Sequence, residues 1–282
     1  MSVALLMASI KAFAWFMTDS VAVLSSLLDS LLDVVASTVT LVAIRSAQVP
    51  ADRDHRFGHG KAEPLAALAQ SAFVAGSAVL LLFEAGHRFI HPRAVERPEL
   101  GIGVIAFTIV VTLALVSFQV WVTRRTGSIA INADALHYKG DLLMNAGVIA
   151  ALILSGWYGW IYADPIFAIG IAVYILANAW TIVHEALDML MDKELPEEER
   201  EQIYRIAESH PGTRHAHDLR TRRSGQMTLI QLHLEMDRDI SLFRAHQIAE
   251  EVQAKILEAF PGAEVIIHQD PEGLEEHHPQ IS

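Results

Sequence analysis

Six long apolar spans fill the first two thirds of this 282-residue chain. A helix needs about 20 apolar residues to cross the roughly 30 Å hydrocarbon core of a bilayer. The spans therefore predict six transmembrane helices, at about residues 2–17, 20–46, 62–90, 100–123, 128–156 and 160–188. The first is short for a bilayer, and we expect Met1 to be an internal start of a longer natural chain.

The composition changes near residue 190, where the apolar spans end and acidic residues become frequent. Mean hydropathy is +0.32, and we predict a six-helix transmembrane domain at 1–190 followed by a cytosolic domain at 191–282. Periodicity and turn residues after Asp192 predict an α-β-β-α-β order. This is a small α+β domain of ferredoxin-like or metallochaperone-like type, with helices at 195–209 and 241–260 and strands at 215–223, 227–237 and 264–268.

The charge and composition exclude several classes of protein. A net charge of −12 argues against nucleic-acid binding, which needs a basic surface. The chain has no cysteine, so disulfides and thiolate metal sites are ruled out, whereas 14 histidines and 33 acids favour nitrogen and oxygen ligands. Lysine and arginine are more frequent in the loops after the second and fourth spans, and the positive-inside rule then places both termini in the cytoplasm.

Two matched pairs of polar residues interrupt the apolar spans. Asp29 and Asp33 lie four residues apart in the second span, and His137 and Asp141 have the same spacing in the fifth. This spacing puts both members of a pair on one helix face. Ionisable residues inside a membrane are costly and mark functional sites, so we predict a tetrahedral metal site of three carboxylates and one imidazole between these helices. A buried polar network, or the lining of a water-filled cavity, is the alternative.

Asp134 lies one turn before His137. It is interpreted either as an acceptor that orients the imidazole ring or as a helix-end charge near water.

A second cluster of metal-ligand types occupies the loop between the second and third spans. Asp52, His55 and His59 have a spacing that can close on one ion, and glycines on both sides of His59 favour a tightly folded loop. A solvated charged loop is the alternative. Lys61 in this loop and Asp192 after the sixth span lie on the same side of the membrane, and we expect them to pair between helices or protomers.

A third group of candidate ligands is spread through the cytosolic domain. Its members fall on the predicted strands and second helix: His217, His233, His246, His268 and Asp270. They indicate a further metal site, with ordinary surface histidines as the alternative. His210 and His215 are expected to be exposed histidines of no special role.

Motifs of ATP hydrolysis and of covalent catalysis are absent from the sequence. We therefore predict that the protein is not an enzyme and that an ion gradient drives any transport. A membrane metal sensor or scaffold is the main alternative, although a sensor has no need of acids inside the bilayer. An intramembrane metalloenzyme would need an open coordination position, which four protein ligands do not leave.

Taken together, these motifs resemble the cation diffusion facilitator family, and within it the FieF-type bacterial exporters of zinc and iron. The resemblance covers essentially the whole chain and rests on the segments at 25–33, 57–63, 133–141, 216–222 and 265–271. It implies a homodimeric, proton-coupled antiporter in the bacterial inner membrane. The transported ions would be Zn²⁺ and also Cd²⁺ or Fe²⁺, with zinc held structurally at a binuclear cytosolic site as well.

Overall fold

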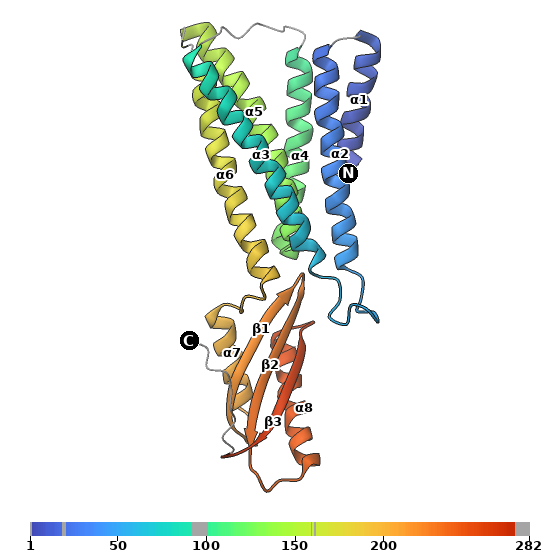
Figure 1. Cartoon of the computed structure of the whole chain (residues 1–282), viewed down its shortest axis with the longest axis vertical. Coiled ribbons are helices and arrows are strands. Elements are labelled where there is room, and N and C mark those ends of the chain that lie inside the picture. Colours follow the sequence, from blue (N-terminus) through green and yellow to red (C-terminus); the bar gives the residue numbers. More distant parts are fainter. Residues whose placement is uncertain (1, 19–20, 92–100, 159, 161, 274–282) are drawn as a thin grey trace. The chain divides into compact units, whose positions relative to one another are not determined.

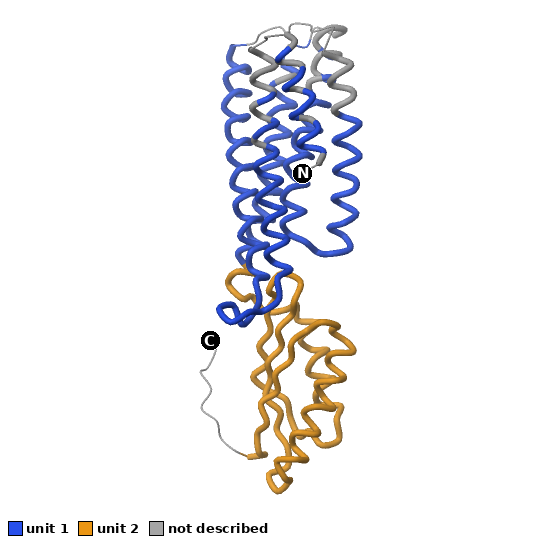
Figure 2. The backbone as a smooth tube through the Cα atoms, turned by 90° about the vertical axis from the view of Figure 1, so that its right-hand side faces the viewer, with its two compact units in different colours: residues 1–187 blue, residues 188–282 orange. Residues whose placement is uncertain are grey.

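The structure is a computed structural model that describes residues 2–18, 21–91, 101–158, 160 and 162–273. It divides into two compact units, Met1–Leu187 and Asp188–Ser282 (Figure 2). The sequence predicts a domain boundary at 190/191, and that boundary stays a prediction.

The described part of the first unit is a bundle of six helices (Figure 1). They are α1 (Ser2–Thr18), α2 (Val21–Ala47), α3 (Ala62–Ile90), α4 (Gly101–Thr126), α5 (Ile129–Tyr158) and α6 (Ala163–Leu190). Each begins and ends close to its predicted span. Helix α2 packs against α1, α3 and α5, while α5 also packs against α3 and α4.

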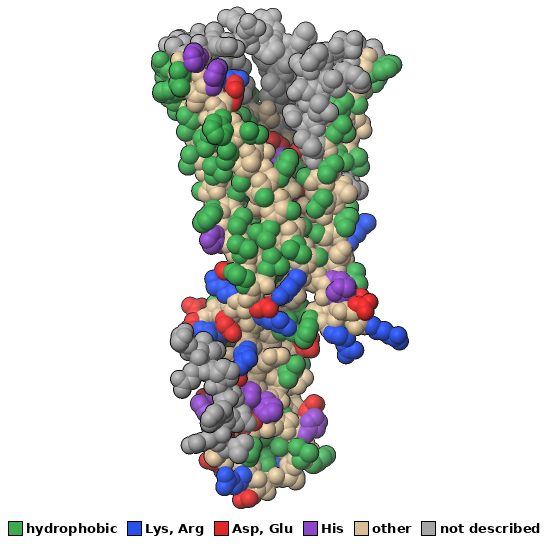
Figure 3. Space-filling view, in the orientation of Figure 1, with side chains coloured by type: hydrophobic (Ala, Val, Ile, Leu, Met, Phe, Trp, Pro, Cys, Tyr) green, Lys and Arg blue, Asp and Glu red, His purple; other side chains and the backbone are tan. Residues whose placement is uncertain are grey.

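Small residues allow these helices to approach closely. Ala67 on α3, Ala133 on α5 and Ala172 on α6 are completely buried, which is typical of helix packing in membranes. Large apolar side chains point outward instead, among them Leu80 and Phe83 on α3, and hydrophobic side chains are spread over the visible face of the bundle (Figure 3). Among the described residues, Ala62–Ile90 and Pro165–Leu190 are long and apolar enough to span a bilayer.

The second unit is a three-stranded sheet with two helices. Its order is α7 (Glu197–Glu208), β1 (Thr213–Ser224), β2 (Met227–Met236), α8 (Leu242–Ala259) and β3 (Glu264–Pro271). Strand β2 is central, antiparallel to β1 and parallel to β3. The predicted α-β-β-α-β order is confirmed, and Gly225 with φ 62° makes the hairpin turn.

Strand alternation divides this sheet into an apolar and a polar face. Ile230, Leu232 and Leu234 on β2 are at most 1% exposed and form a core with α7 and α8. The intervening residues of β2, His233 among them, point to the opposite face. The candidate ligands on the strands, His217, His233, His268 and Asp270, therefore lie on the face of the sheet opposite to the apolar core.

Candidate metal centres

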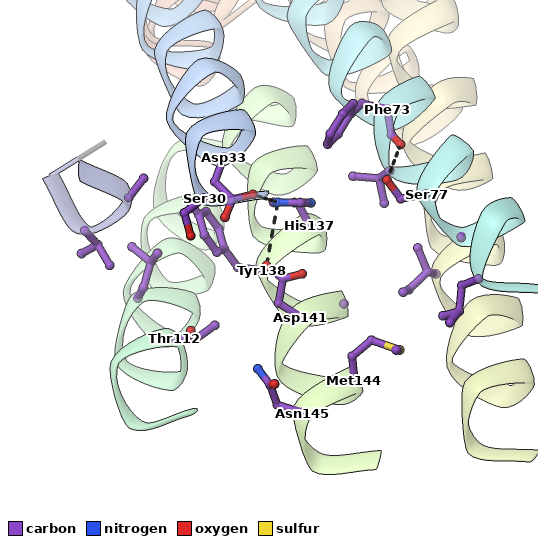
Figure 4. Close-up of a pocket in the computed structure, with 18 residues that line it drawn as sticks. Ser30, Asp33, Phe73, Ser77, Thr112, His137, Tyr138, Asp141, Met144 and Asn145 are labelled. Atoms are coloured by element: carbon purple, nitrogen blue, oxygen red, sulfur yellow. Dashed lines mark hydrogen bonds and ion pairs between the residues drawn. The ribbon is translucent and has the colours of Figure 1, made fainter. Parts of the chain in front are cut away.

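Helices α2 and α5 bring Asp33, His137 and Asp141 together. The Nε2 atom of His137 lies 2.7 Å from Oδ1 of Asp33 and 3.8 Å from Oδ2 of Asp141, and one ligand atom of each residue lies within 4.8 Å of the others. Figure 4 shows the side chains of Asp33 and His137 pointing toward one another, with Asp141 one turn further along α5. One nitrogen and two carboxylates thus converge from residues about 100 positions apart in the chain.

Asp29 is the fourth predicted ligand of this cluster. It lies on α2 one turn before Asp33, but its side chain is outside those that the structure describes. Its participation stays a prediction.

A cavity of about 470 Å³ adjoins the cluster. Asp33, His137 and Asp141 line it together with Ser77, Met144 and Asn145, and acidic and histidine side chains are visible in a hollow of the bundle (Figure 3). The Tyr138 hydroxyl, also at this cavity, is 3.0 Å from Oγ of Ser37 and ties α5 to α2. A dication in this cavity would therefore have the side chains of Asp33, His137 and Asp141 within reach as ligands.

The position of Asp134 in the structure agrees with neither of the two interpretations made from the sequence. Asp134 is buried, and its Oδ2 atom accepts a hydrogen bond from Nε2 of Gln119 on α4 at 2.6 Å. Burial excludes a helix-end charge near water, and the hydrogen bond that the structure gives it goes to Gln119 instead of the His137 ring. The sequence does not predict this role of Gln119, because an apolar span does not show which of its polar residues faces α5.

The loop before α3 brings Asp52, His55 and His59 together. Oδ1 of Asp52 lies 3.4 Å from Nδ1 of His55, and its Oδ2 lies 3.4 Å from Nε2 of His59. The backbone N–H groups of His55 and Asp54 donate to Oδ1 of Asp52, and the His55 bond in particular lowers the pKa of this carboxyl below its usual value. The carboxylate is therefore held ionised beside two imidazoles.

The cytosolic cluster is organised by strand register. His217 on β1 and His268 on β3 both pair with His233 on β2, which places three imidazoles in one row across the sheet. Asp270 is buried beneath them: its Oδ2 lies 2.8 Å from Nδ1 of His233 and 3.7 Å from Nε2 of His217. Its Oδ1 lies 3.1 Å from Nε2 of His268.

His246 lies apart from this row. It is an exposed residue of α8, and the ion pair that the structure gives it is with Glu250, one turn away, at 3.9 Å. Within one chain, the described structure brings His217, His233 and Asp270 within ligand distance of one another but not His246.

Asp218 was not predicted but lies beside this row. Strict strand alternation would place the Asp218 side chain on the other face of the sheet from His217. A bulge between His217 and Arg220 interrupts the register. Asp218 adopts φ 45°, and its Oδ2 lies 3.7 Å from Nε2 of His233. A bulge of this kind has no signal in a single sequence.

His210, expected to be exposed, is instead 95% buried, because its exposed fraction is 5%. Its Nε2 lies 2.8 Å from Oε2 of Glu251 on α8, and its Nδ1 accepts the Gly212 N–H. His215 is exposed, as expected, and its Nδ1 lies 3.0 Å from Oε1 of Glu208.

Lys61 and Asp192 belong to different units. Lys61 precedes the first residue of α3. Asp192 follows α6 with φ 57° and forms an ion pair with Arg222 at 3.1 Å. The predicted pairing of Lys61 with Asp192 stays a prediction.

Comparison with known proteins places the chain in a family. The cation efflux transmembrane domain matches residues 1–191, and the cytoplasmic domain of cation efflux proteins, a dimerisation domain, matches residues 195–272. The chain belongs to the cation efflux family. This confirms the resemblance to the cation diffusion facilitators and the predicted fold class, a transmembrane helical domain with a small cytoplasmic α+β domain.

Individual relatives of this cation efflux protein cover nearly its whole length. The cation-efflux pump FieF of Salmonella arizonae is 50% identical over 271 residues, which are 96% of this chain and 89% of the relative. FieF of Klebsiella pneumoniae is 49% identical over 265 residues, 94% and 88% of the two chains. A metal-bound C-terminal domain of the CzcD transporter from Thermotoga maritima is 28% identical, with a TM-score of 0.27, and covers 28% of this chain and 93% of that structure.

Proposed function

We propose that the chain exports divalent transition-metal cations, Zn²⁺ and also Cd²⁺ or Fe²⁺, from the cytoplasm in exchange for protons. Membership of the cation efflux family and about 50% identity to FieF pumps support metal-cation export. The observation that carries the finer proposal is the convergence of Asp33, His137 and Asp141 beside a cavity of the helical bundle. With Asp29, these residues would hold the transported ion.

The donor set suits zinc-like ions. Imidazole nitrogen and carboxylate oxygen are both ligands of Zn²⁺, and four protein ligands in a tetrahedron leave no open position for hydrolytic chemistry. Imidazole also favours zinc over manganese, which prefers oxygen ligands. The side chains therefore support binding and release of a cation instead of catalysis.

Proton exchange follows from the charge of the proposed site. Three carboxylates contribute three negative charges and the dication two positive ones, so the loaded site carries one net negative charge. Without the ion, neighbouring carboxylates in a low-dielectric bundle repel one another, and protons relieve this repulsion. Because ligands must be deprotonated to bind metal, protons and metal compete for Asp29, Asp33, Asp141 and His137.

Flux in proteoliposomes tests this proposal. We expect zinc uptake to be accompanied by proton movement in the opposite direction, and both to be lost in Asp33→Asn, which keeps the side-chain shape but removes the charge. Glu84→Gln is the matched control, because Glu84 is an exposed acid of α3 that pairs with Arg88. Zinc flux that leaves internal pH unchanged at every gradient would contradict proton coupling, and full flux in Asp33→Asn would contradict the site.

The cytosolic unit is proposed to bind zinc as a structural or regulatory ion in a homodimer. The match to a cytoplasmic dimerisation domain supports the homodimer. Asp270 is buried and its two oxygens face three imidazoles, so the donor set fits zinc. His217, His233, His268 and Asp270 would hold the ion, with exposed His246 available as a further ligand.

Zinc bound per chain at equilibrium tests the cytosolic site. We expect His233→Ala combined with Asp270→Ala to reduce the zinc bound by the full chain while zinc binding that depends on Asp33 survives. His215→Ala is the control, because His215 is an exposed neighbour of His217 on β1. Unchanged zinc content in the double variant would rule out this site.

A further inference from the structure

Two histidines at the end of α3 differ from the other histidines in the described part of the chain. His87 lies in the last turn of this helix, His91 directly follows its last residue, and their stacked ring centroids are 5.0 Å apart. Every other described histidine has a ring nitrogen close to a carboxylate or a backbone carbonyl. The rings of His87 and His91 have no such partner among the described residues, so their nitrogens are available to a ligand.

Helical geometry holds these two rings beside each other. The His91 N–H donates to the His87 carbonyl oxygen at 2.9 Å, so the helical turn continues to His91 although α3 ends at Ile90. Residues four apart share one helix face. Two Zn–N bonds of about 2.0–2.1 Å hold two nitrogens no more than about 4 Å apart, and rings with centroids 5.0 Å apart can reach that separation by side-chain rotation. The spacing is that of a two-ligand metal site.

The pair lies at the water boundary of the bundle. Helix α3 has 29 residues and is roughly 43 Å long at 1.5 Å per residue, whereas the hydrocarbon core of a bilayer is about 30 Å thick. Its last turn therefore extends into the interface, where the Phe89 and Tyr162 rings form an aromatic contact at 5.3 Å. Both histidines are exposed, and Figure 3 shows histidine, acidic and basic side chains together at the upper end of the bundle.

The charges around the pair are compatible with a cation. The terminal carbonyl groups of α3 give this end of the helix a partial negative charge. Arg88 lies between the two histidines in the sequence, but its Nε atom is 2.8 Å from Oε1 of Glu84, so its charge is compensated. Neutral imidazoles add nitrogen donors without negative charge. An ion held here would therefore keep most of its charge and bind more weakly than at the carboxylate-rich cluster between α2 and α5.

The position of the pair on α3 relates it to the cavity. Ser77 of α3 lines the cavity beside the cluster between α2 and α5. Residues seven apart lie close to one helix face, so His91 follows Ser77 along the same stripe, fourteen residues and roughly 21 Å further at 1.5 Å per residue. The 48–61 loop precedes α3 and lies at its other end. An ion that leaves the cavity away from this loop along α3 would reach the pair.

We propose that His87 and His91 form a binding site for one divalent transition-metal cation at the end of α3 opposite the 48–61 loop. Imidazole nitrogen suits Zn²⁺, Ni²⁺ and Cu²⁺, whereas Mg²⁺ and Ca²⁺ prefer oxygen ligands, so the site distinguishes between classes of dication. The site itself requires only these two side chains and water. Its role, to hold the cation after release from the cluster between α2 and α5, rests on the proposed function.

Protection of a thiol tests the pair at a single position, because the chain has no cysteine of its own. In His87→Cys the thiol and the His91 imidazole would still form a two-ligand site, and Cd²⁺ is the probe because thiolate binds soft ions. We expect Cd²⁺ to slow the labelling of His87→Cys by a membrane-impermeant thiol reagent. Adding His91→Ala should raise the Cd²⁺ concentration for half-protection by about tenfold or more, as the loss of a residue that supports a metal site does.

Matched variants separate chelation from other effects. Adding Ile90→Ala to His87→Cys should leave half-protection unchanged, because Ile90 is 74% exposed beside His91 but offers no ligand. The reciprocal variant His91→Cys, with and without His87→Ala, keeps the test decisive if His87→Cys does not fold. Protection that is equal with and without the second histidine would overturn the site. Protection that depends on the second histidine in a chain that moves no zinc would retain the site and reject the proposed function.

The native pair and its side of the membrane are tested separately. His87→Ala with Ile90→His keeps two histidines but at adjacent positions, which do not face each other, and should bind one zinc fewer per chain at saturation. Unchanged zinc content would contradict the native site. In vesicles of a single orientation, His87→Cys should be labelled from the side opposite to that which labels Ala51→Cys, an exposed loop position. Labelling of both from one side would overturn the placement on the release side.

Discussion

His137 is the residue at which Asp33 of α2 and Asp141 of α5 come together. Its Nε2 atom is closer to Asp33 on another helix, at 2.7 Å, than to Asp141 on its own helix, at 3.8 Å. Helical spacing alone predicts the contact within α5 but gives no distance across to α2. The shorter contact therefore depends on how α2 and α5 pack, which the interfaces with α3 and the Ser37–Tyr138 hydrogen bond help to define.

At the residue scale, the His210–Glu251 pair predicts a pH-dependent stability. The hydrogen bond from His210 lowers the pKa of the Glu251 carboxyl below its ordinary value of 4.5. A carboxyl whose pKa is lowered on folding stabilises the fold above its unfolded pKa, and this stabilisation is lost as the pH falls through the folded pKa. We expect Glu251→Gln to speed hydrogen exchange in α8 at neutral pH.

Hydrogen exchange in α8 at lower pH provides a comparison for this prediction. The difference between native chain and Glu251→Gln should shrink as the pH is lowered from 5 toward that pKa, because the native carboxyl is then also neutral. Glu258→Gln, an exposed acid of the same helix, should exchange like the native chain throughout. A difference that stays constant over this pH range would show that the ion pair is not its source.

At the element scale, the sequence predicts most helices and strands because apolar periodicity marks them directly. Helices α2 and α3 begin within one residue of their predicted starts. Strand β3 continues to Pro271, three residues beyond the predicted His268, because parallel pairing with β2 extends to Met236. The bulge at Asp218 and the burial of His210 are tertiary effects that a single sequence does not reveal.

The first turn of α8 gives a prediction at this scale. The Ser241 hydroxyl accepts the Arg244 N–H at 3.2 Å and caps the helix. Removing such a cap costs about 1 kcal/mol, so Ser241→Ala should speed hydrogen exchange in the turn that carries His246. Ser241→Asp, which keeps an acceptor, should behave as the native chain does. Equal exchange in Ser241→Ala and the native chain would mean that the cap contributes nothing.

At the scale of the whole molecule, composition separates a membrane part from a polar part, but it does not show how the ligands are distributed between them. The three predicted clusters lie in a helix pair, a loop and a sheet, and each is assembled by a different rule. Helical spacing predicts the cluster in the helix pair, and proximity in the sequence predicts the cluster in the loop. The cytosolic row depends on strand register, and three strands far apart in sequence must pair before its histidines meet.

The last prediction concerns the expected pairing of Lys61 with Asp192. If these charges pair between helices or protomers, Lys61→Ala and Asp192→Asn should each weaken the dimer, and the double variant should weaken it by less than the sum. Exposed ion pairs contribute about 0.2–1 kcal/mol, so the coupling should fall in that range. Dimer dissociation measured on dilution in detergent provides the four constants of the cycle.

Two features of the structure sharpen this test. Asp192 also pairs with Arg222, so Asp192→Asn alone disturbs two contacts and only the coupling with Lys61→Ala isolates the predicted one. Lys193→Ala is the matched control, because the adjacent Lys193 pairs with Asp188 at 2.5 Å. Additive effects of Lys61→Ala and Asp192→Asn would reject the pairing.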